Sequence, residues 1–461
     1  MPNISAIWPR AAALIAAPLC AARLCIIGAM PAALLGGAPA QAAPSRPETR
    51  MAAYTAQDAP YGQALLERLV RQNSGSLNVD GVTAVGMMMQ AELAALGFTV
   101  EWVPMGQTGR AGHIFATHRG NGRGRRVLMI GHLDTVFEPA SPFQGYTRTG
   151  DRVTGPGVLD DKGGLVVIIG ALRAMHAAGT LADADIMVVL TGDEERLGDP
   201  AQVARRNLVD AGQWADAALE YENMVADDAG AEFGTIARRS SLNWVVRATG
   251  HTGHSSGIFN DRMGYGAIYE MARILDSFRR DLPEPNLTYN VGLMSGGTPA
   301  DLDASEEVAT GTGKTNIIPS HAVARGDVRT LTREQDARVR ARMQAIVAAH
   351  LPGTSATIAF NEGYPPMAPT PGNRALLAQL NVVNQDLGLP PMAEYDPARR
   401  GAADSGFVAA DVDVLGGLGA VGGGAHAVGE WVDLTSLPRQ ALRSAVLISR
   451  ITREPRAQPQ R

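Results

Sequence analysis

The chain has 461 residues, of which 41 are Lys or Arg and 46 are Asp or Glu, so its formal net charge is −5. At roughly 100–200 residues per domain, this length corresponds to two or three domains. A hydrophobic content of 45% with 19% charged residues is typical of globular proteins and excludes extensive disorder. The acidic balance argues against a nucleic-acid binder.

The first 42 residues have the composition of a signal peptide. They contain no acidic residue, they include a long stretch rich in Ala, Leu and Ile, and they end in the small-x-small sequence Ala40-Gln41-Ala42. A membrane anchor is the alternative, but prolines interrupt the apolar run. We expect export with cleavage near Ala42, a periplasmic or extracellular location, and no stable membrane span in the mature form. Cleavage would also remove Cys20 and Cys25, the only cysteines, and with them any disulfide or thiol chemistry.

Residues 43–239 are expected to form the first part of a catalytic domain. Helical patterns and short apolar strands follow one another there. The helices are expected at 62–72, 81–96 and 165–176, and the strands at 126–130 and 185–190. Such alternation predicts an α/β fold with a mostly parallel sheet flanked by helices. Ligands bind at the carboxyl ends of the strands in such sheets.

From about residue 240 the predicted elements change to the order β-α-β-β-α-β, which is the ferredoxin-like pattern. The strands are expected at 241–249, 287–294, 322–330 and 354–360, and the helices at 264–279 and 333–350. We interpret residues 240–353 as an inserted α+β domain. Residues 354–461 then form the second part of the catalytic domain, with helices at 373–387 and 436–453.

His132 and Asp134 directly follow a predicted buried strand. Side chains two residues apart in an extended chain point to the same side. A histidine that binds a metal needs a partner for its second ring nitrogen, and Asp134 is suitably placed to be that partner. The structural alternative is a histidine at a strand end beside a solvated aspartate.

Carboxylates cluster at three further places, and one more histidine lies near the C-terminus. The carboxylates are Asp160 and Asp161 in a glycine-rich turn, Asp193–Glu195 after a buried strand, and Glu220 and Glu222 after another apolar run. Each cluster alone could be a helix cap or an exposed acidic loop. Adjacent carboxylates, however, repel one another unless a cation gathers them. His426 follows three glycines, which allow the backbone to fold closely around a site.

Together these residues supply nitrogen and oxygen ligands without sulfur. Imidazole with carboxylate suits zinc, and also manganese or cobalt. Two histidines with three or four carboxylates are too many ligands for one tetrahedral ion. They fit two ions about 3.5–4 Å apart, bridged by a carboxylate and a water, with one carboxylate left as general base.

The motifs resemble those of a family of dinuclear zinc peptidases and deacylases. That family includes glutamate carboxypeptidase, acetylornithine deacetylase, succinyl-diaminopimelate desuccinylase and aminoacylase. The matching segments occur in the family's order and cover about residues 60–455. They are GHLDTV (131–136), GPGVLDDKGG (155–164), TGDEE (191–195), LEYE (219–222), GHTGHSSG (250–257), TNIIP (315–319), GDVR (326–329) and GGAHAVGEW (423–431). The resemblance is greatest to the glutamate carboxypeptidase branch.

The resemblance implies a role for each of the motif side chains of the catalytic domain. The ligands would be His132 and Glu222 for one zinc, Glu195 and His426 for the other, and Asp160 as the bridge, with a cis peptide bond after it. Asp134 would orient His132, and Glu194 would take a proton from the bridging water and later deliver it to the leaving amine. The family's Glu-Pro reads Glu222-Asn223 here, so Glu220 remains an alternative ligand.

The inserted domain resembles the family's dimerisation lid, which implies a homodimer. His254 would reach the partner subunit's site and stabilise the tetrahedral oxyanion, with His251 as the alternative. Asn316 and Arg329 would bind substrate, and the forked guanidinium of Arg329 suits a carboxylate. The family's Gly-Gly-Thr-Asp near the substrate reads 401-GAAD-404 here.

The resulting hypothesis is an exported zinc-dependent metallopeptidase that acts on a small peptide or N-acyl amino acid beside a free carboxylate. Cobalt and manganese are alternative metals. An N-acyl-amino-acid deacylase or a dipeptidase of the same family is the alternative activity. A non-catalytic binding protein would lack a ligand or the base, but every expected position is filled.

Overall fold

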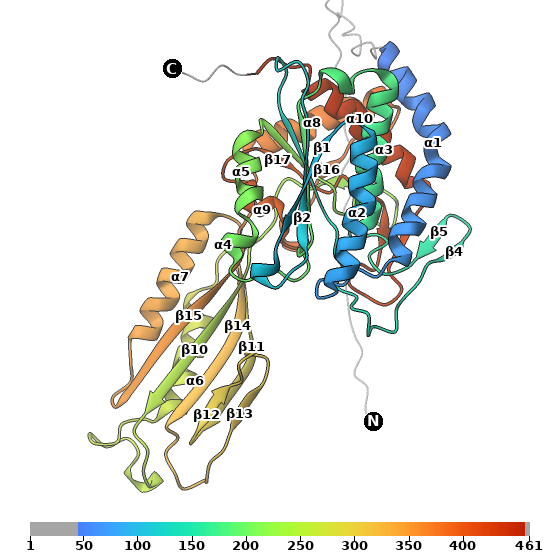
Figure 1. The fold of residues 1–461 in the computed structure, drawn as a ribbon. Helices are drawn as coiled ribbons and strands as arrows, with labels where there is room; N and C mark the ends of the chain where they lie inside the picture. Colours follow the sequence, from blue (N-terminus) through green and yellow to red (C-terminus); the bar gives the residue numbers. More distant parts are fainter. Residues whose placement is uncertain (1–44, 457–461) are drawn as a thin grey trace, which may run out of the picture. The chain divides into compact units, whose positions relative to one another are not determined.

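A six-stranded sheet forms the centre of the catalytic domain (Figure 1). The computed structural model describes residues 45–456, so the expected signal peptide, residues 1–42, lies outside the described residues. The strands are β1 (Thr99–Pro104), β2 (Gly112–His118), β3 (Val127–His132), β6 (Ile186–Thr191), β7 (Ala217–Glu220) and β17 (Val414–Leu415). Their order is β1-β2-β6-β3-β7-β17, and β6, β3, β7 and β17 run parallel, whereas β2 is antiparallel to β1 and β6. The expected α/β fold with a mostly parallel sheet is confirmed.

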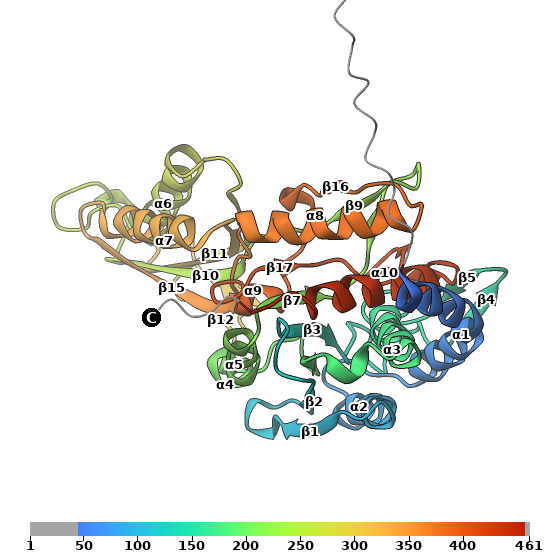
Figure 2. The same ribbon diagram turned by 90° about the horizontal axis from the view of Figure 1, so that it is seen from above.

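Side chains of the central strands alternate between two buried cores. Val127 and Met129 of β3 belong to the larger core, whereas Leu128 and Ile130 belong to the smaller one. The larger core includes α1 (Arg46–Arg71), α2 (Val79–Ala95), α3 (Lys162–Ala178), α8 (Pro371–Asp386) and α10 (Ser436–Ile451). The smaller includes α5 (Arg206–Trp214), preceded by the short α4 (Ala201–Ala204), and α9 (Ser405–Val408). Helices thus flank the sheet (Figure 2), which explains why its central strands β3 and β6 are largely apolar and buried.

The first helix begins earlier than its hydrophobic pattern predicts. The pattern gives residues 62–72, but α1 begins at Arg46. Ser45 and Glu48 form a capping box, in which the Ser45 N–H donates to the Glu48 carboxylate at 2.8 Å. The start of this helix is therefore fixed by its cap.

Two small sheets connect loops that are distant in sequence. One contains β4 (Thr147–Thr149), β5 (Arg152–Thr154), β18 (Gly422–Gly423) and β19 (Trp431–Asp433), and the other contains β8 (Val225–Ala226), β9 (Glu232–Gly234) and β16 (Ala393–Glu394). Trp431 of β19 pairs with Thr154 of β5. This pairing sets the loop after β5, residues 155–161, beside the loop before β19, residues 424–430.

The inserted domain has the expected β-α-β-β-α-β order. Its strands are β10 (Ser241–Gly250), β11 (Thr288–Gly297), β14 (His321–Arg329) and β15 (Thr354–Tyr364), arranged antiparallel in the order β11-β14-β10-β15. Helices α6 (Ala267–Asp281) and α7 (Arg333–Ala348) pack on this sheet and share a core that includes Trp244 and Phe278. A hairpin of β12 (Ala300–Leu302) and β13 (Ala309–Gly311) was not expected from the pattern.

The expected boundary of the inserted domain at residue 353 requires a correction. Strand β15 begins at Thr354 and pairs with β10 from Thr354 to Tyr364. Its backbone hydrogen bonds thus belong to the sheet of the inserted domain, and the second part of the catalytic domain begins only after residue 364.

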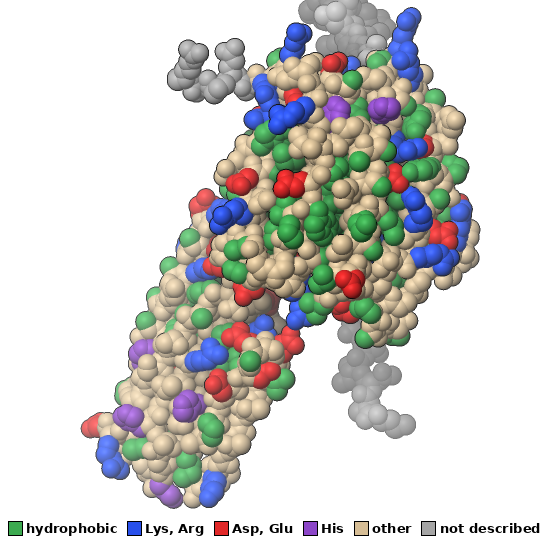
Figure 3. Space-filling model, viewed as in Figure 1, with side chains coloured by type: hydrophobic (Ala, Val, Ile, Leu, Met, Phe, Trp, Pro, Cys, Tyr) green, Lys and Arg blue, Asp and Glu red, His purple; other side chains and the backbone are tan. Residues whose placement is uncertain are grey.

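Among residues 45–456, every helix is too short or too polar to cross a membrane. On the face that Figure 3 shows, acidic and basic side chains are interspersed, as the nearly balanced composition predicts.

Candidate metal centre

Three neighbouring strands end at the same edge of the sheet and bring candidate ligands together. Strand β3 ends at His132, β6 is followed by Asp193–Glu195, and β7 is followed by Glu222. Because β6, β3 and β7 are adjacent and parallel, their carboxyl ends meet. The sequence separates these side chains by up to 90 residues, and the sheet topology removes that separation.

Asp160 lies between the two histidines. Its Oδ1 is 3.0 Å from His132 Nε2, and its Oδ2 is 3.2 Å from His426 Nε2. The peptide bond from Asp160 to Asp161 is cis, as the resemblance implies. One carboxylate therefore presents a separate oxygen to each imidazole, which is the arrangement that a bridging ligand requires.

The remaining carboxylates lie on either side of Asp160. Glu195 Oε2 is 2.9 Å from His426 Nε2, and its Oε1 is buried without a hydrogen-bond partner among the described residues. Two sets of side chains each offer ligand atoms that lie within 4.8 Å of one another. They are His132, Asp160 and Glu195, and His132, Glu194 and Glu222. His132 is common to both sets.

Asp134 holds two parts of the site at once. Its backbone carbonyl and its Oδ1 lie 3.1 and 3.4 Å from His132 Nδ1. Its two carboxylate oxygens also accept the backbone N–H groups of Glu194 and Glu195, both at 3.0 Å. Ser76 Oγ donates a further hydrogen bond to Asp134 at 2.6 Å. With the Nδ1 proton donated to Asp134, the Nε2 lone pair of His132 is directed at the cluster.

Glu220, the alternative ligand, has other partners. It accepts hydrogen bonds from Arg238 Nη2 at 2.6 Å and from Ser405 Oγ at 2.9 Å. Arg238 also contacts Glu222, at 2.8 Å. The structure brings Glu222, and not Glu220, within reach of His132.

Glu430 was not singled out from the sequence. Its carboxylate accepts the backbone N–H groups of Gly157, Leu159 and Asp160 at 3.1, 2.8 and 2.9 Å. Glu430 lies four residues after His426, so it joins the loop of that histidine to the loop of the bridging carboxylate. The sequence signal that could have identified Glu430 was its position within the motif at residues 423–431.

A buried ion network supports the loop that carries Glu194 and Glu195. Arg205 Nη1 lies 2.5 Å from Asp193 Oδ1, and its Nε lies 2.7 Å from Asp404 Oδ1. The hydroxyl of Tyr364, at the end of β15, donates to the backbone carbonyl of Glu194. Sequence patterns missed Arg205 and Tyr364, because each meets its partners only in the folded chain.

The carboxylates of the cluster are buried close together, and the positive charge near them is too small to keep their pKa values in the ordinary range. Burial raises the pKa of Glu195 and of Glu222 to about 7, and burial together with Glu222 raises the pKa of Glu194 well above its ordinary value. Hydrogen bonds to Asp160 and Glu195 raise the pKa of His426 to about 11. Carboxylates that are costly to ionise together, with an orphaned buried Glu195 oxygen, fit a site for divalent cations.

The expected lid residues make their contacts within the inserted domain. His254 Nδ1 lies 2.8 Å from Ser256 Oγ, and Arg329 Nε donates to Asp327 Oδ2 at 3.1 Å. The backbone carbonyl of Asn316 accepts the Ser255 N–H. None of these side chains belongs to either set of possible metal ligands among the described residues. The ring of His251, the alternative to His254, contacts the backbone carbonyl of Arg262 at 2.9 Å.

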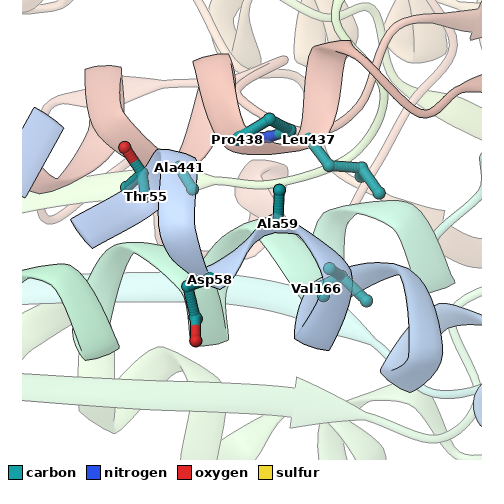
Figure 4. A pocket seen from close by; sticks show the side chains of 9 residues that line it. Thr55, Asp58, Ala59, Val166, Leu437, Pro438 and Ala441 are labelled. Carbon is teal, nitrogen blue, oxygen red and sulfur yellow. The ribbon is translucent and has the colours of Figure 1, made fainter. Parts of the chain in front are cut away.

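A small cavity lies apart from the cluster. It occupies about 30 Å³ between α1, α3 and α10, and Figure 4 shows Thr55, Asp58 and Ala441 among its lining residues. This volume holds little more than one or two water molecules. Because no member of the carboxylate cluster lines it, it is not the functional site.

Comparison with known proteins assigns the family. The model of "Peptidase family M20/M25/M40" matches residues 128–449. The chain belongs to this family. The matched M20 region includes every candidate metal ligand named above, and the resemblance expected from the motifs is confirmed. As an M20 protein, the chain is a metal-dependent hydrolase.

Individual M20 relatives span most of the chain. Carboxypeptidase G2 of Pseudomonas sp. (strain RS-16) is 27% identical over 390 residues, which are 83% of this chain and 87% of that protein. A succinyl-diaminopimelate desuccinylase of Acidiphilium cryptum (strain JF-5) is 26% identical over 398 residues, 84% of this chain and 98% of that protein.

Solved structures share the fold. Aminopeptidase PepT from Bacillus cereus has a TM-score of 0.66 at 17% identity and covers 87% of this chain and 98% of its own. A dinuclear metal binding peptidase of the M20 family from Bacillus subtilis has a TM-score of 0.59 at 16% identity, with coverage of 86% and 99%.

Proposed function

We propose that the protein is an exported, zinc-dependent carboxypeptidase that hydrolyses an amide bond next to a free carboxylate. The observation that carries this proposal is the position of Asp160, whose two oxygens lie 3.0 and 3.2 Å from the Nε2 atoms of His132 and His426. One carboxylate shared by two imidazoles suits a centre of two metal ions. The similarity to carboxypeptidase G2 favours the carboxypeptidase activity over other activities of the family.

The ligands present fit two divalent ions. His132 and Glu222 would hold one ion, Glu195 and His426 would hold the other, and Asp160 would bridge them. Nitrogen and oxygen donors without sulfur suit zinc, with cobalt and manganese as alternatives. Glu195 Oε1 is buried and has no hydrogen-bond partner among the described residues, so it is available to bind a cation.

The chemistry that we propose for the chain's own residues centres on Glu194. Bound metal ions would supply Lewis-acid activation of a water molecule and of the scissile carbonyl. Glu194 takes a proton from the attacking water and delivers it to the amine nitrogen as the C–N bond breaks. Asp134 holds the Glu194 backbone in place, because its carboxylate accepts a hydrogen bond from the Glu194 N–H.

Substrate recognition is proposed to come from the inserted domain. Arg329 would bind the free carboxylate of the substrate, and Asn316 would bind beside it. In a homodimer formed through the inserted domains, His254 would stabilise the oxyanion in the site of the other copy. The exposed positions of His254 and Asn316 are consistent with this role.

The alternative activity is that of an N-acyl-amino-acid deacylase or dipeptidase with the same metal centre. The similarity to succinyl-diaminopimelate desuccinylases favours the deacylase among these. The metal ligands and Glu194 would be identical, and only the groups that flank the scissile bond would differ.

A substrate panel tests the proposal. The panel contains peptides with C-terminal glutamate, their C-terminal amides, dipeptides and N-acetyl amino acids. A carboxypeptidase cleaves the free acids and not the amides, and Arg329→Ala should raise KM for the acids by about 10- to 100-fold, as expected for a lost charge-assisted pair. Arg325→Ala, on the same strand, is the matched control. Equal turnover of acids and amides would refute the carboxypeptidase assignment, and a preference for N-acetyl amino acids would select the deacylase.

Export is tested separately. The full-length chain, expressed in a Gram-negative host, should be recovered from the periplasm or medium with a mass that corresponds to cleavage after Ala42. Recovery of the uncleaved chain from the cytoplasm would contradict export.

A further inference from the structure

Glu222 is contacted by two buried guanidinium groups. Arg238 Nη2 lies 2.8 Å and Arg400 Nη2 lies 3.4 Å from the same Glu222 oxygen, Oε2. The side chains of Arg238 and Arg400 are 1% and 9% exposed. A carboxylate that is to bind a metal ion therefore already has one oxygen engaged by cationic donors.

The charges of the two arginines are balanced differently. Arg238 is paired with a second carboxylate, Glu220, at 2.6 Å. Arg400 instead contacts Asn223, whose side-chain and backbone oxygens lie 2.9 and 3.1 Å from its nitrogens, and its Nε is buried with no partner among the described residues. Within the described part of the chain, Glu222 is the one carboxylate within 4 Å of Arg400. Among the described residues, Arg400 thus adds a positive charge whose one direct ion pair is with Glu222.

The other side of Asp160 carries no such charge. Glu195 Oε2 meets His426, Glu195 Oε1 is unpartnered, and among residues 45–456 no Arg or Lys forms an ion pair with Glu195. The two prospective metal positions share Asp160 but differ in their surroundings. One faces the guanidinium of Arg400, which contacts its ligand Glu222, and the other faces a Glu195 oxygen that has no hydrogen-bond partner among the described residues.

We propose that Arg400 makes the two metal positions unequal, so that the position of His132 and Glu222 binds its ion more weakly and fills second. The guanidinium competes for Glu222 Oε2 and repels a dication at a short distance inside the protein, where screening is weak. Arg400 is in this sense a positioning residue for Glu222. The inference rests on the proposed two-metal function.

Metal titration tests this proposal without reference to turnover. Metal-free protein is titrated with Zn²⁺ against a chelator of known affinity, and bound zinc is counted by mass spectrometry after dialysis. The wild type should load in two separate steps. Arg400→Gln should tighten the second step by about tenfold or more, whereas Arg400→Lys, which keeps the charge, should leave the steps apart. Arg399→Gln is the matched control, because it removes the charge of the exposed neighbouring arginine.

A second pair of variants identifies the position. Glu222→Gln should leave only the tight step, and Arg400→Gln should then change nothing further. Circular dichroism establishes that each variant is folded, and Arg400→Met provides a second neutral replacement if the glutamine variant does not fold.

The outcomes separate this inference from the proposed function. Two equal steps in the wild type, a second step that Arg400→Gln leaves unmoved or weakens, or equal effects of Arg400→Gln and Arg399→Gln would each overturn the role of Arg400. Tightening by Arg400→Lys would overturn it too, because the charge would not be the cause. Fewer than two zinc ions per wild-type chain at saturating free Zn²⁺ would instead overturn the two-metal centre itself.

Discussion

Arg205 is a deeply buried support of the loop that carries Glu194 and Glu195, and its replacement by methionine should strongly destabilise the protein. The arginine is 1% exposed and lies between Asp193 and Asp404, at 2.5 and 2.7 Å, whose side chains are 0% and 4% exposed. Methionine keeps most of the volume but removes the charge. Removal of one partner from a buried ion pair costs about 3–5 kcal/mol, because the remaining charge is left uncompensated. Two carboxylates are left here, so we expect the free energy of unfolding to fall by about 4 kcal/mol at pH 7–8.

Urea denaturation of metal-free protein at pH 7–8 measures this loss. Arg206→Met is the matched control, since Arg206 is the exposed neighbour in sequence, and it should change the unfolding free energy by less than about 0.5 kcal/mol. A loss below about 1 kcal/mol for Arg205→Met, or a loss equal to that of Arg206→Met, would refute the reasoning.

Three further perturbations probe the site. Glu194→Gln should lower kcat by about 10²- to 10⁴-fold, as expected for a lost general base, while zinc content measured by mass spectrometry stays at the wild-type value; loss of zinc would make it a ligand instead. Asp134→Asn should weaken metal binding in a chelator competition by about 10- to 100-fold, because Asp134 orients His132; unchanged affinity would contradict that role. Burial lowers the pKa of His113, so its stabilising contribution should be present above about pH 6.5 and lost as pH falls below it, and urea denaturation should show a flatter profile from pH 7 to 5 in His113→Gln; an equally steep profile would count against this assignment.

The strand-end ligands could be found from the sequence because sheet topology is regular. His132, Asp193–Glu195 and Glu222 each follow an apolar run, and parallel strands bring their carboxyl ends to one edge. The order of the inserted domain followed from the same patterning. Each predicted strand and helix depends on a pattern of residues that are close in sequence.

The supporting arginines could not be found in this way. Arg238 and Arg400 meet Glu222 across 16 and 178 residues of sequence, and no periodicity records such a contact. The boundary at residue 353 was wrong, although the predicted pattern already included the strand at 354–360, because β15 pairs with β10 in the sheet of the inserted domain. The start of α1 at Arg46 could have been predicted from the sequence, since Ser45 and Glu48 have the spacing of a capping box.

The central claim is that two metal ions held by this cluster perform the hydrolysis. Its most direct test measures zinc content and hydrolysis of a C-terminal glutamyl peptide together, on protein beginning at Ala43, before and after chelation. The account predicts two zinc ions per chain, with activity lost on chelation and restored by added metal. Activity that survives complete removal of metal, or the absence of stoichiometric metal in active protein, would contradict it.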